Sequence, residues 1–472
     1  MTTTHGGPVA ALPGGAFLAE IRARLPGLRL LDDSIDLESY RRDETPYVAA
    51  GRPLAVALPT ETSEVAELVR LAAARRVPIV PRGAGTGLSG GANGIEGGLT
   101  IAFTRMDRIL EIDEANLVAV VQPGVVNAEL KRAVAAKGLF YAPDPASYET
   151  CTIGGNLGTN AGGLCCVKYG QTRDSVLGLE VVLADGSIVR TGGRNAKDVA
   201  GYSLTHLIVG SQGTLGIVTE ATLRLRPAPP ARLTLLAFFA DVDAAGRAVA
   251  ALAPAGLAPV TLELLDHETI LAVDDAFGLG LDRDAAAMLL VESDLPAGAA
   301  AAELDRAERE ALACGATSVV RAADATEADW LRQARREALH ALERQGVVKM
   351  EDVVVPRARV PELLRAITAI ADRHAVRCAT FGHAGDGNLH PNFVFAPDDP
   401  SAEATLAAMQ DELYRAAIEL GGSMTGEHGV GLARVEWLEL QRGADAVRVM
   451  RAIKHALDPL GILNPGKVLP PD

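Results

Sequence analysis

The sequence predicts an α+β protein of several domains, because two parts of the chain follow different patterns. Residues 53–82 run in the order strand, helix, strand and lead into a glycine-rich loop, which is a β-α-β unit. Beyond a proline-rich linker at 227–230, residues 233–322 follow the order β-α-β-β-α-β, the split pattern of a ferredoxin-like sheet. With 472 residues, 48% of them apolar, the chain is long enough for about two to four domains.

The composition indicates which partners and which compartment to expect. A formal net charge of −15 argues against nucleic acid or an anionic membrane as the main partner. The 5 cysteines include no Cys-x-x-Cys pair, as is typical of a reducing cytoplasm without disulfides. The N-terminal residues lack the basic and apolar regions of a secretion signal, and the sequence has no apolar run long enough for a transmembrane segment. We therefore expect a cytoplasmic protein.

The first part of the chain should begin with a helix and continue as strands and helices. Residues 16–31 have the pattern of an amphipathic helix broken at Pro26-Gly27, and a polar loop follows. Ser63 is the candidate N-cap of a helix at 63–75, and Gly138 closes a helix at 127–137. Strands are expected at 54–59, 77–81, 99–103, 109–113, 117–124 and 219–227.

The second part should form a sheet covered by helices. Its split β-α-β-β-α-β core is expected to use strands 233–239, 259–265, 286–293 and 317–322 and helices 241–253 and 298–313. A helix at 325–345, a strand at 347–356 and a helix at 359–374 extend it. Helices at 401–420 and 445–457 and a turn at 464–467 complete the chain.

Three glycine-rich tracts lie in the first part, at 81–93, 151–163 and 210–218. Glycines let backbone N–H groups approach an anion closely, and the tracts also carry Ser, Thr, Asn and Gln side chains. The first tract is neither a Walker loop nor part of a complete dinucleotide-binding unit. Surface turns would account for one tract, but three within about 140 residues favour an extended cofactor that bears phosphate.

A hairpin in the second part is a candidate metal site. In residues 380–395, a turn at Asp-Gly would place His383 and His390 at mirrored positions on one face, with Asn392 on the same face. Paired imidazoles suit Zn, Fe or Mn. Two histidines hydrogen-bonded in a polar turn would show the same spacing.

A carboxylate farther along the chain supports the metal site. Glu427, between glycines, can complete a His-His-carboxylate set with the two hairpin histidines. His428 points to the other side if the chain is extended there, so it stays free as a general base.

Eight motifs follow one another through about residues 35–470. They are PRGAGTGLSGGA, QPGV, CTIGGNLGTNAGG, KYG, GSQGTLGIVTEATLRL, GHAGDGNLHPN, TGEHGVG and NPGK. In this order they resemble the FAD-linked D-2-hydroxy acid dehydrogenases of the vanillyl-alcohol-oxidase flavoprotein superfamily. This group includes the glycolate oxidase flavoprotein subunit, D-lactate dehydrogenases and D-2-hydroxyglutarate dehydrogenase.

The resemblance implies the domain organisation. It implies an N-terminal helical segment at 1–50, a two-subdomain FAD-binding domain of the vanillyl-alcohol-oxidase type at 51–227, and a ferredoxin-like substrate or cap domain at 228–415. The C-terminal segment 416–472 would return to the flavin and complete its site. FAD should be bound non-covalently, because Gly85-Thr86-Gly87 contains no histidine where some members of the superfamily attach the cofactor.

The resemblance also implies which residues contact FAD. They belong to the glycine tracts, to short turns between them and to the C-terminal segment. The expected contacts are Pro81, Arg82, Gly83, Ala84, Gly85, Thr86, Gly87, Leu88, Gly91, Ala92, Pro123, Gly124, Ser147, Ile153, Gly154, Gly155, Asn156, Gly158, Thr159, Asn160, Gly163, Tyr169, Gly170, Gly216, Ile217, Val218 and Asn464.

The reaction implied is oxidation of a D-2-hydroxy acid to the 2-oxo acid. His428 would take the hydroxyl proton, hydride would pass to flavin N5, and Arg335 would hold the substrate carboxylate. Asn392 completes the expected catalytic set. A divalent metal, Zn or else Mn or Fe, would orient the substrate. Electrons would leave to a protein or quinone acceptor, for example an iron-sulfur subunit. Such a partner would hold the protein at the membrane periphery. A homodimer is compatible with the sequence.

Three alternatives stay open. A metal-dependent hydrolase that binds a nucleotide substrate in the glycine tracts would be colourless. A flavin-carrying electron-transfer subunit of a glycolate-oxidase-like complex would bind FAD without being reduced by any hydroxy acid. A D-2-hydroxyglutarate dehydrogenase would need a site for a second carboxylate.

The residues near Arg335 bear on that last alternative. Relatives that use D-2-hydroxyglutarate have a hydroxyl residue one helical turn after the arginine and a lysine on the next strand, where this chain has Leu339 and Met350. Lys349, one residue away, should point to the opposite face of the strand. We therefore expect a preference for D-lactate, glycolate or a longer apolar D-2-hydroxy acid.

Overall fold

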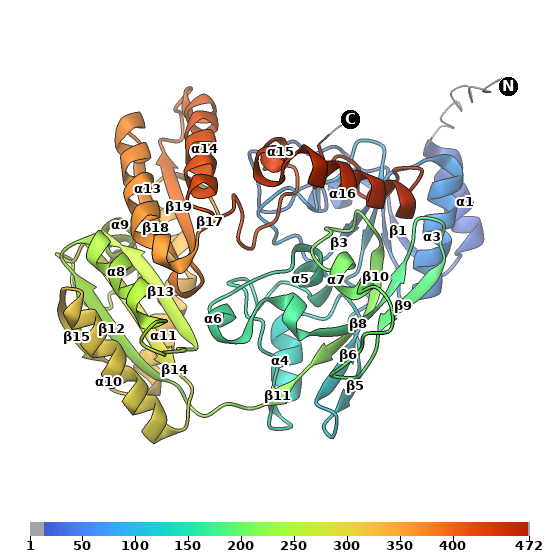
Figure 1. Cartoon of the computed structure of the whole chain (residues 1–472). Coiled ribbons are helices and arrows are strands. Elements are labelled where there is room, and N and C mark those ends of the chain that lie inside the picture. Colours follow the sequence, from blue (N-terminus) through green and yellow to red (C-terminus); the bar gives the residue numbers. More distant parts are fainter. Residues whose placement is uncertain (1–13, 471–472) are drawn as a thin grey trace.

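The computed structural model describes residues 14–470, which form two lobes (Figure 1). The chain leaves the first lobe after β11 (Arg226–Pro227) and returns to it with α15 (Leu438–Arg442) and α16 (Ala444–Leu457). Among residues 14–470, no helix is long and apolar enough to cross a membrane. The expectation about a secretion signal falls mainly on residues 1–13, which lie outside the described residues.

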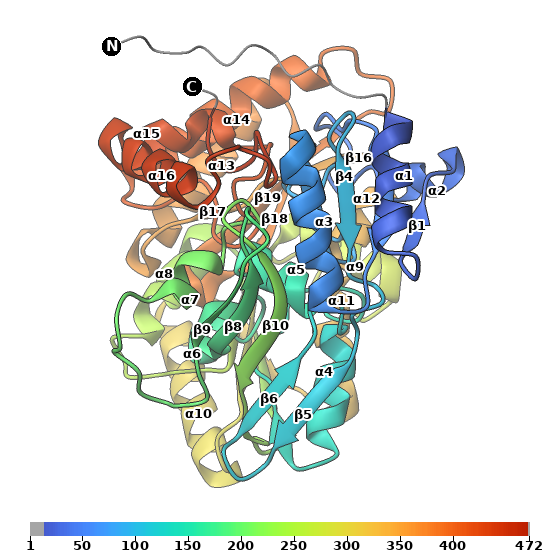
Figure 2. The ribbon, with the colours of Figure 1, turned by 90° about the vertical axis from the view of Figure 1, so that its right-hand side faces the viewer.

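The first sheet of the first lobe has the order β1-β2-β4-β3. Strands β2 (Ala55–Leu58), β4 (Leu99–Ala102) and β3 (Ile79–Arg82) are parallel, because α3 (Thr62–Arg75) makes the crossover between β2 and β3. Figure 2 shows α1 (Gly14–Arg24) beside α3. The expected β-α-β unit is confirmed, and it ends where the first glycine tract begins.

The expectations for the N-terminal 50 residues were wrong in three places. The broken helix ends at Arg24, and β1 (Arg29–Leu31) pairs with β2, so this segment is the edge of the first sheet and not a separate helical unit. The polar loop contains α2 (Ser34–Ser39), whose N-cap Asp33 accepts from the Ile35 backbone. Helix α3 begins at Thr62 and has no side-chain N-cap, so Ser63 lies inside the helix and is not its N-cap.

The second sheet of this lobe is antiparallel, in the order β5-β6-β10-β8-β9. Its strands are β5 (Ile109–Asp113), β6 (Val118–Val121), β10 (Ile217–Arg224), β8 (Val176–Val182) and β9 (Ile188–Gly192). One face packs on α4 (Asn127–Ala135), α5 (Ile153–Thr159) and α7 (Leu204–Ile208), and β7 (Leu139–Phe140) pairs with β11. The sequence patterns had not indicated β8, β9, α5 or α7.

The second lobe is built on one sheet with the order β15-β12-β14-β13-β18-β19-β16. Its strands are β12 (Leu233–Phe239), β13 (Thr261–Asp266), β14 (Ala287–Ser293), β15 (Ala316–Arg321), β16 (Val347–Met350), β18 (Arg377–His383) and β19 (Asn388–Phe395). Counted along the chain, β15-β12-β14-β13 is the order 4-1-3-2 of antiparallel strands. The expected ferredoxin-like sheet is therefore confirmed, and it continues through the hairpin.

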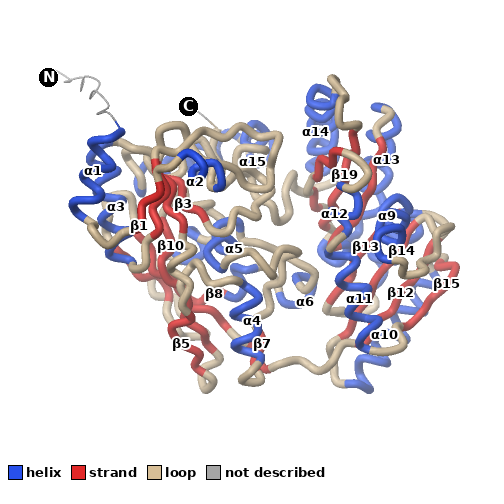
Figure 3. The backbone as a smooth tube through the Cα atoms, turned by 180° about the vertical axis from the view of Figure 1, so that it is seen from behind, coloured by secondary structure: helices blue, strands red, loops and turns tan. Residues whose placement is uncertain are grey.

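Helices cover both faces of this sheet. Alternate residues of β12 separate the two layers: Leu235 and Phe239 pack toward α8 (Val242–Leu252) and α10 (Ala297–Ala313), with α13 (Val360–His374) and α14 (Ala402–Glu419) in the same core. Leu236 and Phe238 pack on the opposite side toward α9 (His267–Phe277), α11 (Ala325–Arg336) and α12 (Ala338–Glu343). Seen from behind, α11 and α12 lie on the side of this lobe that faces the first lobe (Figure 3).

Three expectations for the second lobe differ from the structure. The helix expected at 325–345 is divided into α11 and α12, and α9 had not been indicated. The strand expected at 347–356 is interrupted at Glu351-Asp352, between β16 and β17 (Val353–Val354). A domain boundary at 415 would cut α14, whose buried residues pack with α13.

Candidate active site

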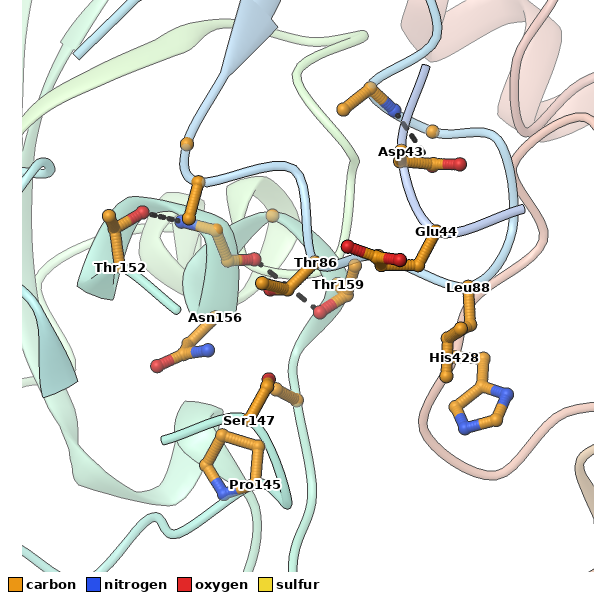
Figure 4. A pocket seen from close by; sticks show the side chains of 18 of the residues that line it. Asp43, Glu44, Thr86, Leu88, Pro145, Ser147, Thr152, Asn156, Thr159 and His428 are labelled. Carbon is orange, nitrogen blue, oxygen red and sulfur yellow. Dashed lines mark hydrogen bonds between the residues drawn. The ribbon is translucent and has the colours of Figure 1, made fainter. Parts of the chain in front are cut away.

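A cavity of about 580 Å³ lies between the two lobes. The three glycine tracts form its first-lobe wall, and α11, α12, the β18–β19 hairpin and residues 427–428 form the other side. Figure 4 shows Thr86, Asn156, Thr159 and His428 around this cavity. All of the expected metal ligands therefore lie on the same cavity as most of the expected cofactor contacts.

The first glycine tract follows β3 and lines the cavity closely. A Cβ on Gly83 would lie 2.4 Å from Thr152 Oγ1, and Gly85 has a φ of +87°. Asp43 and Glu44, which the sequence patterns had not indicated, also line the cavity, and the Glu44 N–H donates to the Gly87 carbonyl. The loop is thus held open and shaped by a segment about 40 residues earlier in the chain.

The second tract contains a helix that the sequence patterns had not indicated. Residues 153–159 form helix α5, whose N-cap Thr152 accepts from the Gly155 N–H at 3.3 Å. A Cβ on Gly154 would lie 2.6 Å from Pro123 Cβ, so glycine is needed for the close approach of this helix to the Pro123 turn. Asn156 and Thr159 reach the cavity from the same helix.

Eight expected site residues do not line the cavity, namely Gly124, Ile153, Asn160, Gly163, Tyr169, Gly170, Asn392 and Asn464. Ile153 is in the core, and the Tyr169 hydroxyl donates to Asp294 of the other lobe. Asn464 Nδ2 donates to the carbonyls of Gly91 and Gln212, so it supports the glycine tracts from behind. The Asn392 amide donates to the carbonyls of Ala379 and His390.

The hairpin register differs from the expected one. His383 pairs with Asn388 across a four-residue connection, and His390 pairs with Phe381, so the two histidines are not at mirrored positions. The shift is by two residues, which keeps both side chains on one face of the sheet. Their ring centroids are 5.3 Å apart. The two histidines therefore share one face of the sheet, as expected, although the expected pairing register of the hairpin was wrong.

The two histidines and Glu427 converge. His383 Nε2 lies 3.1 Å and His390 Nε2 lies 3.3 Å from Glu427 Oε1. A Cβ on Gly162 would lie 2.3 Å from Glu427 Oε2, so the first lobe approaches this carboxylate closely. Burial opposes ionisation of Glu427, but the two imidazoles lower its pKa well below the usual value. Two imidazole nitrogens around one carboxylate oxygen are a donor set for a divalent ion.

The turn that carries Glu427 and His428 is held by Asp352. One oxygen of this buried carboxylate accepts from Thr425 Oγ1 at 2.6 Å and from the backbone N–H groups of residues 426, 427 and 428 at 2.9 to 3.0 Å. The other oxygen accepts from Asn388 Nδ2 at 2.7 Å and lies 3.7 Å from His390 Nδ1. Asp352 sits in the break between β16 and β17, which explains why the expected strand is interrupted there.

His428 is stacked on His390, with ring centroids 5.1 Å apart and ring planes 8° apart. Burial, opposed by the nearby Asp352 carboxylate, lowers the pKa of His428 to about 4, so the imidazole is neutral near pH 7. Its Nδ1 has no hydrogen-bond partner among residues 14–470. A neutral, partly unpaired imidazole on the cavity wall can accept a proton.

Arg335 lies at the end of α11 and is 3% exposed. Its guanidinium stacks over the Phe381 ring at 4.5 Å, and Nη2 lies 2.7 Å from Glu263 Oε2. Its Nε and Nη2 have no hydrogen-bond partner among the described residues, so the Glu263 contact is an ion pair, and the side chain borders the cavity. A buried cation with an unused donor on a cavity wall is suited to a ligand carboxylate.

The cavity wall near Arg335 carries charged and polar side chains, such as Arg336 and His340, together with apolar ones. Leu339 and Met350 line it, as expected. Lys349 does not, and its ammonium lies 4.4 Å from the centre of the Tyr47 ring. The expected register of β16 is thus confirmed.

Two family models match the chain. The model described as the FAD binding domain covers residues 53–192, and the model described as the C-terminal domain of FAD linked oxidases covers residues 228–468.

Curated relatives match over nearly the whole length. Glycolate oxidase subunit GlcD of Bacillus subtilis (strain 168) is 46% identical over 92% of this chain and 92% of that protein. D-lactate dehydrogenase of Anaerostipes hadrus is 36% identical, covering 93% and 94%, and D-2-hydroxyglutarate dehydrogenase of Xanthomonas citri pv. viticola is 36% identical, covering 96% of each. Among solved structures, p-cresol methylhydroxylase has a TM-score of 0.80 at 18% identity, covering 96% of each chain, which shows a shared fold.

Proposed function

This chain belongs to the family of FAD-linked oxidases and has a fold of the vanillyl-alcohol-oxidase type, and from that premise we propose that it oxidises D-2-hydroxy monocarboxylates. The product would be the 2-oxo acid. One observation carries the proposal: His428, Arg335 and the cluster around Glu427 converge on the cavity that the glycine tracts line. The first lobe, together with the C-terminal segment that returns to it, would bind FAD, and the second lobe would bind the substrate.

The first-lobe wall fits FAD. Glycines bring backbone N–H groups to the cavity surface, Thr86 and Thr159 add hydroxyls, and the buried Arg82 supplies positive charge beside them. The loop offers no histidine for a covalent link, so the cofactor would be held by these contacts alone.

The cluster of His383, His390 and Glu427 fits a divalent ion, with Zn as the first choice and Mn or Fe as alternatives. Bound FAD would take up the hydride from C2, and a divalent ion would polarise the hydroxyl oxygen of the substrate. The chain itself supplies orientation and a base. Arg335 would hold the carboxylate and His428 would accept the hydroxyl proton, so loss of that proton and of the C2 hydride leaves the 2-oxo acid.

The cavity favours a monocarboxylate. Leu339 and Met350 offer no hydrogen-bond donor to a second carboxylate, and burying one against them would cost several kcal/mol, whereas a hydrogen, methyl or alkyl group would be accommodated there. We therefore propose D-lactate, glycolate or a longer apolar D-2-hydroxy acid as the substrate. The electrons would leave to a protein or quinone acceptor. The relative from Bacillus subtilis is named as a subunit, which supports a complex with other subunits.

An anaerobic screen of 2-hydroxy acids tests the proposal. Each acid is mixed with the purified yellow protein, and the flavin absorbance is followed. Bleaching by D-lactate or glycolate is the expected result. Bleaching by D-2-hydroxyglutarate alone would identify that substrate instead. A colourless protein would favour a hydrolase, and a yellow protein that no acid bleaches would favour an electron-transfer subunit.

A further inference from the structure

A buried carboxylate of the second lobe lies between the metal cluster and Arg335. Glu263 is on β13, is fully buried and belongs to none of the eight motifs. Its Oε1 lies 2.8 Å from His383 Nδ1, and its Oε2 lies 2.7 Å from Arg335 Nη2. One side chain therefore contacts both a proposed metal ligand and the proposed carboxylate-binding residue.

The contact with His383 decides which nitrogen of that ring is free. A carboxylate accepts hydrogen bonds and does not donate them, so Nδ1 must carry the proton that faces Glu263. A histidine binds a metal as the neutral imidazole, and in that form the lone pair is on Nε2, the nitrogen that faces Glu427 Oε1. A carboxylate behind a ligating histidine fixes its tautomer and orientation in many metal sites.

The contact with Arg335 sets the orientation of its guanidinium group. The Phe381 ring lies against the guanidinium, and Glu263 is the carboxylate that pairs with it. The unused Nε remains for a ligand. A carboxylate has two oxygens and can serve His383 and Arg335 at once, whereas a glutamine amide has one acceptor and one donor and can serve only one of them.

Building on the proposed function, we propose that Glu263 is a positioning residue that sets both the metal-binding tautomer of His383 and the orientation of Arg335. It contacts neither the metal nor the substrate. Replacement of Glu263 should therefore weaken both metal binding and substrate binding, while FAD stays bound.

The test compares Glu263→Gln with Glu292→Gln in the FAD-loaded protein. Glu292 is a matched control: it is also fully buried, lies on the adjacent strand β14 and pairs with Arg332 of the same helix α11, but it does not contact His383. Zn²⁺ affinity is measured by competition with a chromogenic chelator. KM and kcat are measured with the acid that bleaches the wild-type flavin, at limiting and at saturating Zn²⁺.

Glu263→Gln should lower Zn²⁺ affinity by about 10- to 100-fold and raise KM by about 10-fold or more, with the FAD content unchanged. Saturating Zn²⁺ should restore kcat but leave KM high, because the orientation of Arg335 does not return with the metal. Glu292→Gln should lower thermal stability and leave both Zn²⁺ affinity and KM near wild type. A merely structural role for Glu263 would make the two variants alike.

Zn²⁺ affinity and KM within about threefold of wild type in Glu263→Gln would overturn the inference. If Glu263→Gln does not accumulate with FAD, Glu263→Asp is measured in its place. The shorter side chain keeps the negative charge but moves it away from His383 and Arg335, so a lower Zn²⁺ affinity and a higher KM are again expected. Wild-type protein that binds no Zn²⁺, or that no hydroxy acid reduces, would refute the proposed function itself, and that result does not depend on Glu263.

Discussion

Replacement of Asp352 by asparagine should loosen the turn that carries Glu427 and His428. One carboxylate oxygen accepts four hydrogen bonds from residues 425–428, and the other accepts one from Asn388. An amide has a single acceptor oxygen. In Asp352→Asn the NH₂ group must therefore face either the four donors of residues 425–428 or the Asn388 amide. The orientation toward Asn388 loses only one hydrogen bond, so we expect that one.

The size of the effect follows from these contacts. Hydrogen bonds to a charged acceptor contribute about 1.5–3 kcal/mol and neutral ones about 1 kcal/mol, so four weakened bonds and one lost bond would cost roughly 3.5–11 kcal/mol if they were additive. Bonds that share one acceptor oxygen are not additive, so we take the lower part of this range, about 3.5–6 kcal/mol. This local destabilisation should raise the opening equilibrium of the turn by about 10²- to 10⁴-fold.

Hydrogen–deuterium exchange of the peptide 423–431 measures this opening directly. The matched control is Asp266→Asn, because Asp266 is a partly buried carboxylate of the same lobe, which accepts from Thr269 and Thr380 and does not line the cavity. The control should speed exchange around residues 266–269 and at Thr380, and leave 423–431 unchanged. Exchange of 423–431 within about threefold of wild type in Asp352→Asn would show that the turn is held by other contacts.

Four further outcomes are expected. Acid precipitation of the yellow protein should leave the flavin in the supernatant, and flavin in the pellet would mean a covalent link. His428→Ala should lower the rate of flavin reduction by about 10²- to 10⁴-fold with FAD still bound, and a rate near wild type would assign the base to another residue. His383→Ala or His390→Ala should remove the divalent ion measured by elemental analysis and most of the turnover, while active wild-type protein without metal would refute the cluster. The ratio kcat/KM should be higher for D-lactate or glycolate than for D-2-hydroxyglutarate, because Leu339 and Met350 line the cavity; the reverse order would refute that argument.

The sequence predicted the fold of the second lobe well because its signals are local. Strands such as 233–239 and 286–293 are continuous apolar runs, and the helices between them are amphipathic. The tract 151–163 contains a helix that was not predicted, for the opposite reason. Its glycines favour a loop by intrinsic propensity, but close packing against Pro123 and the second sheet makes residues 153–159 helical.

The candidate site was only partly predictable. His383, His390, Glu427 and His428 stand in short motifs, so their residue types and spacing were informative. Glu263 is an isolated acid in a strand, and Asp352 stands in the break between β16 and β17. Their partners lie up to 120 residues away, so no local pattern could indicate them. The hairpin register depends on a four-residue connection containing Gly387 with a φ of +77°, which an Asp-Gly dipeptide alone does not distinguish from a two-residue turn.

The return of the C-terminal segment to the first lobe affects the order in which this protein can be completed during synthesis. The Asn464 side chain donates to the Gly91 carbonyl, 373 residues earlier, and the Ile79 backbone pairs with residues 462–464 next to the same glycine tract. At about 5–20 residues per second, a ribosome would need roughly 20–75 s to make the chain between Gly91 and Asn464. The second lobe lies wholly within that interval and can fold while the first lobe still lacks part of its structure. We expect the cofactor cavity to take its final shape only after residue 464 has left the ribosome, so that FAD loading follows synthesis.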